Sequence, residues 1–345
     1  MKKIILILLN LMLAVYSWTQ GCVAVRNVAG INPRFSFKEI QTNNKWFLDI
    51  TNRYFEAPRT YRGDEFITDT LVRNKLYTLD ISVTRILNNG WSVALSVPVS
   101  ANSRRNFADH GGPQMPKHTT RSFGLGDIRF TAYKWLLDPM ENKKWNIQAG
   151  LGIKFPTGDY KYQDYFFRND STKVLAPVDQ AIQLGDGGTG MTAELGAFYS
   201  LNTLISIFIN GFYLINPRDQ NGVSNLKGRN ASPQEISNNT TVMSVPDQFN
   251  IRGGANLQFQ KIVLNLGLRY EKVPVNDLFG GNAGFRRAAS ITSVEPGITY
   301  KMKTSLAFLY LGLPFKRNIV QNHQNNMTPA GFAEYLFTFG VQLNL

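Results

Sequence analysis

The chain has very few of the side chains that carry most metal and enzyme chemistry. Its 345 residues include one cysteine, Cys22, and three histidines, His110, His118 and His323. A single cysteine excludes a disulfide framework and a cysteine-based zinc site. The histidines fall in predicted loops, His118 has no evident acidic partner, and no Gly-x-Ser-x-Gly motif occurs. We therefore expect no catalytic residue, no metal and no cofactor.

The sequence also lacks an apolar run long enough for a transmembrane helix, which needs about 20 residues. Residues 4–15 are apolar and follow Lys2 and Lys3, so residues 1–20 are predicted to be a secretory signal peptide. The cleavage site is not clearly marked. Residues 19–22 could form a degenerate lipoprotein box that acylates Cys22, or Cys22 is a lone thiol. Residues 21–44 are then a periplasmic segment or a plug.

Negative charge is comparatively scarce, and the formal net charge is +13 at pH 7. This excess admits an anionic partner such as lipid phosphate or an acidic substrate. Nucleic acid is not expected, because the chain is predicted to be exported and has no basic helix or recognisable nucleic-acid motif. The mean hydropathy of −0.19 fits a chain in which only alternate residues face lipid.

What is present is alternation, and it is clearest at the C-terminus. One face carries Tyr335, Phe337, Phe339, Val341, Leu343 and Leu345. The other carries Glu334, Thr338, Gly340, Gln342 and Asn344, with Leu336 as the one apolar exception. A final strand with one apolar and one polar face is typical of the strand that closes a transmembrane β-barrel. Residues 338–345 also resemble the C-terminal signal read by outer-membrane insertion machinery. The alternative is an edge strand of a soluble sandwich.

The same pattern predicts about 12 strands after residue 44. They are residues 45–56, 76–87, 90–100, 125–137, 144–155, 189–200, 203–215, 248–259, 261–272, 291–301, 303–313 and 332–345. Most are about as long as the 9–11 residues that a tilted strand needs to cross a bilayer. Residues 303–313 are apolar on both faces.

Short and long connections alternate between these strands. The short ones are residues 88–89, 138–143, 201–202, 260 and 302, and the long ones are residues 57–75, 101–124, 156–188, 216–247, 273–290 and 314–331. Tight turns on one side and long loops on the other are typical of an up-and-down barrel. We therefore predict an all-β, transmembrane, up-and-down antiparallel β-barrel over residues 45–345, closed by the C-terminal strand. Because the strand count is even, both termini of the barrel are expected on the periplasmic side.

The inward-facing positions carry charges of both signs in nearly equal number. The candidates for lining the lumen are Asp49, Arg53, Asp80, Asp127, Arg129, Lys154, Glu194, Arg252, Arg269, Glu271, Glu295 and Glu334. Charges at this density are expected to pair across the lumen. Two interpretations stay open at this point: a salt-bridged interior that props open or fills the barrel, and a lining that contacts a solute.

One long loop, residues 273–290, combines aromatic rings, arginines and glycines. Its candidate residues are Phe279, Phe285, Arg286 and Arg287. Glycines permit a tight inward fold, and the arginines could pair with lumen carboxylates such as Glu271 or Glu295. The loop would then constrict the mouth. The alternative is an ordered surface loop.

Several short motifs resemble a family of outer-membrane barrel transporters named for the MetA pathway of phenol degradation. They are GLGDIR at 124–129, GLGIKFPTG at 150–158, GGTG at 187–190 and SVEPGITY at 293–300. The resemblance implies uptake of aromatic or other hydrophobic small molecules. It fixes neither the solute nor any binding residue.

The sequence thus predicts a bacterial outer-membrane channel for passive uptake of a small, hydrophobic or aromatic solute. Its expected partners are outer-membrane lipids and lipopolysaccharide, the insertion machinery and the solute. A structural or surface-interaction barrel that serves adhesion or assembly is the second hypothesis. A lipid-modifying barrel enzyme is the third.

The C-terminal signal gives a first test, the substitution Leu343→Asp or Leu345→Asp. A charge near the membrane interface costs about 0–1 kcal/mol of folded stability. We therefore expect the defect to lie in recognition by the insertion machinery, seen as reduced outer-membrane levels in fractionated cells. Normal surface levels of both variants would contradict the prediction.

Overall fold

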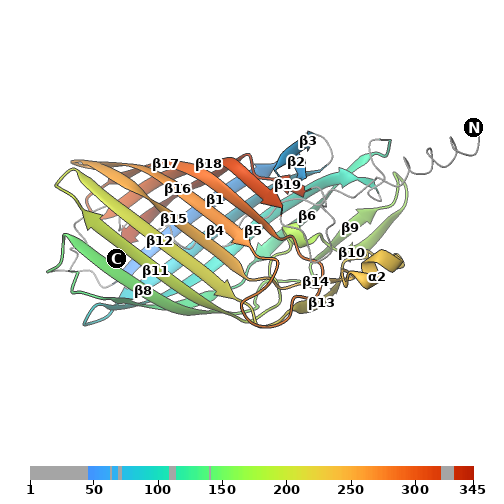
Figure 1. Ribbon diagram of the computed structural model, residues 1–345, viewed down its shortest axis with the longest axis horizontal. Coiled ribbons are helices and arrows are strands. Elements are labelled where there is room, and N and C mark those ends of the chain that lie inside the picture. Colours follow the sequence, from blue (N-terminus) through green and yellow to red (C-terminus); the bar gives the residue numbers. More distant parts are fainter. Residues whose placement is uncertain (1–45, 63, 69–71, 109–113, 140, 320–329) are drawn as a thin grey trace, which may run out of the picture.

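An antiparallel β-barrel makes up most of the chain (Figure 1). The structure, a computed structural model, describes residues 46–62, 64–68, 72–108, 114–139, 141–319 and 330–345. The ring closes where β1 (Trp46–Ala57) pairs with β20 (Tyr335–Asn344). Phe47 lies opposite Asn344 at one end of this seam, and Glu56 lies opposite Tyr335 at the other. The predicted fold class is confirmed.

The predicted segments at 1–20 and 21–44, with Cys22, lie outside the described residues, as do His110 and His323. The remaining strands of the wall follow in chain order. They are β4 (Arg73–Ile86), β5 (Trp91–Phe107), β6 (Lys117–Leu125), β7 (Arg129–Trp135), β8 (Trp145–Lys154), β11 (Gly190–Ser200), β12 (Ile205–Ile215), β15 (Gln248–Phe259), β16 (Ile262–Val273), β17 (Ala289–Lys301) and β18 (Ser305–Ile319).

The 13 strands of this sheet fill 12 positions in the wall, because β6 and β7 both pair with β5 and share one position. Leu125 lies opposite Val99, whereas Arg129 lies opposite Ser96. Three residues of one strand therefore face two of the other, which is a β-bulge. The break suits Pro98, which has no N–H to donate; its carbonyl accepts a hydrogen bond from the Gly126 amide at 2.7 Å.

Several predicted strand ends need correction. The wall position expected at 125–137 already begins at Lys117, and β5 and β18 run several residues further than expected. The predicted last strand, 332–345, divides into β19 (Ala330–Phe332) and β20, so Glu334 precedes the closing strand. These extensions are polar, and a strand that continues beyond the apolar part of a wall no longer shows an apolar–polar alternation.

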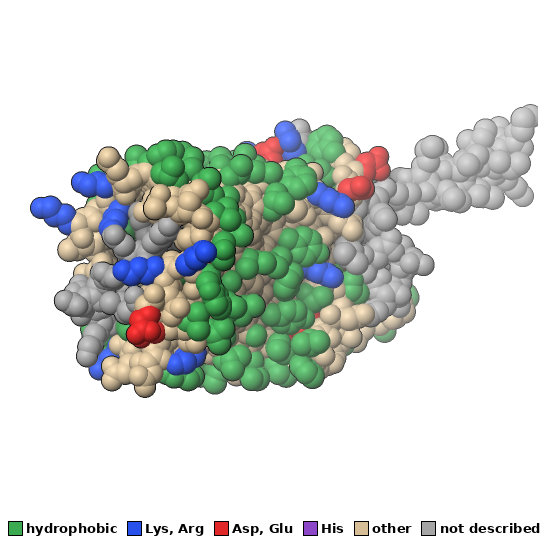
Figure 2. Space-filling view, turned by 60° about the vertical axis from the view of Figure 1, so that its left-hand side comes forward, with side chains coloured by type: hydrophobic (Ala, Val, Ile, Leu, Met, Phe, Trp, Pro, Cys, Tyr) green, Lys and Arg blue, Asp and Glu red, His purple; other side chains and the backbone are tan. Residues whose placement is uncertain are grey.

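Outward-facing side chains form an apolar band across the face of the barrel that Figure 2 shows. The side chains of Leu151 and Leu266 are 71% and 60% exposed, whereas the neighbouring Asn265 and Lys154 are buried inside. A continuous apolar surface of this kind is unfavourable in water and suits a hydrocarbon surround.

Basic and aromatic side chains meet at the short-turn end of the band. The Arg85 guanidinium lies 5.1 Å from the centre of the Trp46 ring, and the Lys134 ammonium lies 5.4 Å from that of Trp91. Aromatic rings favour a membrane interface, and long basic side chains reach from it towards headgroups.

Short turns and long connections alternate as predicted. The turn between β4 and β5 places Asn89 and Gly90 at φ of 57° and 72°, which is the geometry of a tight hairpin turn that matches strand twist. The long connections at the opposite end carry further elements. They are β2 (Arg59–Arg62), β3 (Glu65–Thr68), β9 (Gln163–Phe167), β10 (Lys173–Pro177), the 3₁₀ helix η3 (Gln180–Ile182), β13 (Gln220–Ser224), α2 (Pro233–Ser237), β14 (Val242–Ser244) and β19.

Of the described helices, none has the length and apolar character that a membrane span requires. The strand that is apolar on both faces, β18, turns Phe308 and Tyr310 inwards, where both are buried. These rings lie over Gly340 and Gly297, at which a β-carbon would come within 2.8 Å and 2.3 Å of them. The two glycines therefore make room for aromatic rings inside the wall.

The exposed band predicts how the wall responds to charge. Leu266→Arg places a cation in the middle of β16 on the outer face, where the expected loss of unfolding free energy in vesicles is about 2–4 kcal/mol. Leu278→Arg is the matched control, because Leu278 is 59% exposed in the connection after β16. Equal denaturant midpoints for the two variants would rule out a lipid-facing band.

Candidate solute chamber in the barrel

The connection between β8 and β11 folds into the barrel at its long-loop end. We call residues 179–184 the inward segment. Its side chains are buried, although the surrounding connection is largely exposed. Ile182 is the most deeply buried of them, and its carbonyl accepts hydrogen bonds from Ser122 and, at 3.5 Å, from Asn102 on the barrel wall. The inward segment is therefore held against the wall from inside.

Two glutamines hold the other side of the inward segment. The Gln180 amide donates to the carbonyls of Ser244 at 2.9 Å and Phe285 at 3.3 Å. The Gln183 amide lies 3.0 Å from the sulfur of Met243. The segment thus connects the wall at β5 and β6 with the connections on the opposite side of the mouth.

Asp179 begins the inward segment and accepts ion pairs from two directions. The Arg287 guanidinium lies 2.5 Å from one carboxylate oxygen, and Arg104 lies 3.5 Å from the other. Burial would raise the pKa of Asp179, but Arg104, Arg287 and Lys227, with the backbone amide of Ala181, hold that pKa below its usual range. Asp179 therefore stays ionised.

Below the inward segment lies a chamber with an empty volume of about 820 Å³ that opens to solvent. Its lining mixes charged and apolar side chains from the wall and from the segment. Lining cations are Arg53, Arg129 and Lys154; carboxylates are Asp80, Asp127 and Asp186; apolar side chains include Phe55, Leu76, Leu184 and Leu214. Such a lining can contact a polar group and an apolar group of one small molecule.

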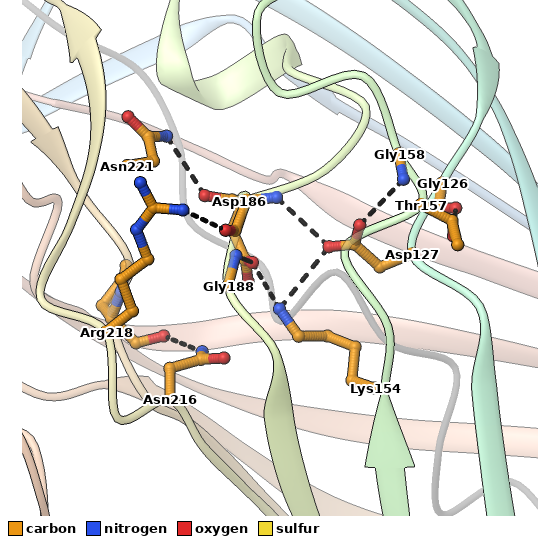
Figure 3. A network of polar contacts seen from close by, with 12 residues as sticks. Gly126, Asp127, Lys154, Thr157, Gly158, Asp186, Gly188, Asn216, Arg218 and Asn221 are labelled. Carbon is orange, nitrogen blue, oxygen red and sulfur yellow. Dashed lines mark hydrogen bonds and ion pairs between the residues drawn. The ribbon is translucent and has the colours of Figure 1, made fainter.

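A network of ion pairs joins the wall of this chamber to its roof (Figure 3). The Lys154 ammonium pairs with Asp186 and lies 3.5 Å from Asp127. Asp127 stands in the bulge between β6 and β7 and accepts hydrogen bonds from the backbone amides of Gly158 at 3.0 Å and Asp186 at 3.2 Å. The bulge therefore aims a carboxylate at the inward-folding connection, as bulges beside functional sites often do.

The close approach of Asp127 to the inward-folding connection explains why residue 185 is a glycine. A β-carbon at Gly185 would stand 2.5 Å from a carboxylate oxygen of Asp127. On the far side of the network, Arg218 donates to the Gly187 carbonyl at 2.8 Å and Asn221 to the Asp186 carbonyl at 3.1 Å (Figure 3). The wall and two long connections are thus joined at Asp186.

A second set of charges crosses the barrel interior. Arg53 of β1 lies 3.4 Å from Glu271 of β16, which lies 2.9 Å from Arg269. Arg269 is 3.5 Å from Glu295 of β17, and Glu295 also pairs with Arg252 of β15. All five side chains are buried. Buried charges need such hydrogen-bonded partners, because each one gives up hydration on burial.

The other predicted lumen residues are placed as follows. Arg129 lies 3.3 Å from Glu194, and Gln342 donates to Asp49. Asp80 lines the chamber. Glu334 stands at the rim, 2.9 Å from Arg59.

The sequence identified the charges of the wall, but it did not identify Asp186 or Asp179, which reach the interior from a connection. Val178, Ala181, Ile182 and Leu184, an apolar cluster within a polar stretch, were the available signal.

The candidate mouth loop, residues 273–290, makes contacts other than those expected from its composition. Phe279 is 61% exposed. Arg286 pairs with Asp277 of the same loop at 2.6 Å, and Arg287 pairs with Asp179. The Phe285 carbonyl accepts from the Ser244 amide at 2.9 Å. Arg287 thus holds the inward segment, which belongs to a different connection.

The position and the partner of His118 differ from the prediction. It lies on β6 rather than in a loop, and Asp170 is an acidic partner at 3.1 Å. The contact depends on the β9–β10 hairpin, which brings together residues 52 positions apart. Within the described part of the chain, no group of three or more His, Cys, Asp or Glu side chains is arranged to hold a metal ion.

A comparison with solved structures identifies proteins of similar fold. An outer-membrane channel from Pseudomonas putida F1 superposes with a TM-score of 0.59 at 10% identity, over 89% of this chain and 97% of that one. The chain has the fold of an outer-membrane channel. A CymD monoaromatic hydrocarbon channel reaches a TM-score of 0.44 at 12% identity, over 88% of this chain and 90% of that one.

At the level of sequence, no family model and no curated protein matches. The resemblance to the phenol-degradation family therefore stays a prediction.

The chamber network predicts the effect of Lys154→Met. Asp127 and Asp186 would then face each other without their shared cation. A broken buried pair typically costs 3–5 kcal/mol, and water in the chamber screens this one, so we expect unfolding free energy in vesicles to fall by about 3 kcal/mol. Adding Asp186→Asn should restore part of it. Lys173→Met removes an exposed lysine of β10 as the control; a Lys154→Met effect no larger than this control would contradict the network.

Proposed function

We propose that the chain is a bacterial outer-membrane channel for passive uptake of a small solute. The closed barrel with an apolar outer band and a chamber of about 820 Å³ under the inward segment carries this proposal. Passive movement through such a chamber needs no cofactor and no catalysis.

The proposed orientation places the short turns in the periplasm and the long connections outside, as is usual for barrels of this kind. The signal peptide at 1–20 and the C-terminal strand would serve export and recognition by the insertion machinery. The exposed band would contact outer-membrane lipids and lipopolysaccharide. The pairs of Arg85 with Trp46 and of Lys134 with Trp91 support a membrane interface at the short-turn end.

The proposed solute is small and carries an apolar or aromatic part together with a polar group. Phe55, Leu76, Leu184 and Leu214 offer apolar surface in the chamber beside Arg129 and Lys154. A purely hydrophobic molecule would leave the charged side of the lining without solvent. The motif resemblance to transporters of the phenol-degradation type points to the same class of solute.

A second candidate function is that of a structural or surface-interaction barrel. Two observations favour it: the charges from Arg53 to Arg252 cross the interior, and the long connections are built into small sheets of their own. Conductance separates the two functions, since a filled barrel conducts no ions.

We therefore expect ion conductance from the purified protein in a planar bilayer. Replacing residues 180–184 by Gly-Ser-Gly should raise it severalfold, because the roof of the chamber is removed. Deleting residues 280–287 should also raise conductance if the 273–290 loop constricts the mouth, as proposed from its composition. Replacing residues 233–237 of α2 by Gly-Ser-Gly is the control at the same end.

Candidate solutes should reduce the current of the wild-type protein. A protein that gives no conductance before or after removal of residues 180–184 would reject the channel and favour the structural barrel.

A further inference from the structure

Asp80 is a buried carboxylate in the wall of the chamber. It lies in the middle of β4 with 9% of its surface exposed, and its oxygens are accessible from the chamber. Within the described part of the chain, no ion pair and no hydrogen bond reaches this carboxylate. A carboxylate that is buried without a partner is unfavourable, because it has given up part of its hydration.

The strand pairing explains why the wall supplies no partner. Asp80 lies between Thr51 of β1 and Pro98 of β5, and a proline has no polar side chain and no N–H to donate. The hydroxyls at the neighbouring positions bond to one another in two pairs, which are Thr78 with Ser100 at 3.2 Å and Ser96 with Ser82 at 3.0 Å. Three of these small side chains line the chamber, so they leave room beside Asp80 for a bound molecule.

The cations of the chamber are already paired with other carboxylates. The pairs are Arg53 with Glu271, Arg129 with Glu194, and Lys154 with both Asp127 and Asp186 (Figure 3). From beyond ion-pair distance, Arg129 and Asp49 act on Asp80 with opposite signs. The chamber therefore offers a cationic solute a carboxylate that has no counter-ion, whereas an anionic solute meets cations that already have theirs.

Apolar surface lies beside Asp80 as well. Pro98 belongs to the wall and Leu184 to the inward segment, and both line the chamber. The two residues are close together, since a β-carbon at Gly126 would stand 3.0 Å from the Pro98 ring and 3.3 Å from the Leu184 carbonyl. A solute with a charged group at Asp80 can therefore bury an apolar group against these two side chains.

We propose that Asp80 binds the ammonium group of a small organic cation whose apolar part rests against Pro98 and Leu184. A primary ammonium is protonated at pH 7 and supplies both the positive charge and the N–H donors that the carboxylate lacks. A neutral alcohol supplies a donor without charge, and an anionic solute would be repelled. The inference rests on the proposed channel, because it names the class of solute that the chamber takes, but binding can be measured without conduction.

Calorimetry with the full chain in an uncharged detergent tests the proposal. Benzylammonium is the probe, and each of three comparison solutes changes one of its features. Benzyl alcohol lacks the charge, benzoate reverses the charge, and methylammonium lacks the ring. We expect benzylammonium to bind at least tenfold more tightly than each of them at pH 7. Binding no tighter than that of any one of the three would overturn the proposal.

Variants then locate the site. Asp80→Asn removes the charge and nearly keeps the shape, so it should weaken benzylammonium binding at least tenfold and change benzyl alcohol binding little. Asp80→Glu keeps the charge and should bind benzylammonium more tightly than Asp80→Asn does. Asp170→Asn is the control, because the Asp170 side chain is 77% exposed outside the chamber, and it should leave binding unchanged. Undiminished binding by folded Asp80→Asn, or an equal loss in Asp170→Asn, would overturn the assignment.

The comparison of the four solutes on the wild-type protein decides the proposal even if Asp80→Asn does not fold. Conductance in a planar bilayer separates this site from the channel function. Benzylammonium binding without conductance would support the site and reject the channel. Conductance that benzylammonium reduces no more than benzoate does would reject the site and leave the channel function standing.

Discussion

The seam between β1 and β20 is the contact on which the rest of the structure depends. Ten residue pairs join the first and last strands of the wall, from Phe47 with Asn344 to Glu56 with Tyr335. Without that seam the sheet would have two open edges, and the N–H and C=O groups along each edge would need other partners. Because the ring is closed, the outer face can be apolar throughout, and every charged side chain of the wall must be accommodated inside or at the ends.

Because the barrel is closed, the charged side chains of its interior need partners inside the barrel. Arginines outnumber carboxylates in the chain from Arg53 to Arg252, and the aromatic faces of Tyr310 and Phe208 lie 4.9 Å and 5.6 Å from the Arg252 guanidinium. Pairing and ring contacts together hold these side chains across the lumen. Of these five charges, Arg53 also lines the chamber, so the other four are used to hold the interior of the wall together.

The mouth is held together by different contacts from those that hold the wall. Its connections come from distant parts of the sequence and meet through a few buried polar residues, chiefly Asp179 and Asp186. Asp186 joins the chamber wall to its roof, whereas Asp179 joins the inward segment to Arg104 of β5 and to Arg287.

The wall of the barrel can be predicted from the order of residues along the chain. Alternation and the spacing of short turns predicted the barrel, the number of its strands and the inward set from Arg53 to Glu295, because a side chain's face follows directly from its position in a strand. Those signals are local, so a sequence can carry them residue by residue.

The arrangement of the mouth depends on contacts that form only in the folded barrel. Asp179 and Asp186, the bulge at Asp127 and the partner of His118 all depend on which connections meet after the barrel closes. Connections have no periodic pattern that reveals their neighbours, and their contacts join residues far apart in the chain. The loop that looked suited to fold inward, residues 273–290, supplies Arg287 as a partner, while the shorter apolar cluster at 178–184 enters the barrel because its burial there removes apolar surface from water.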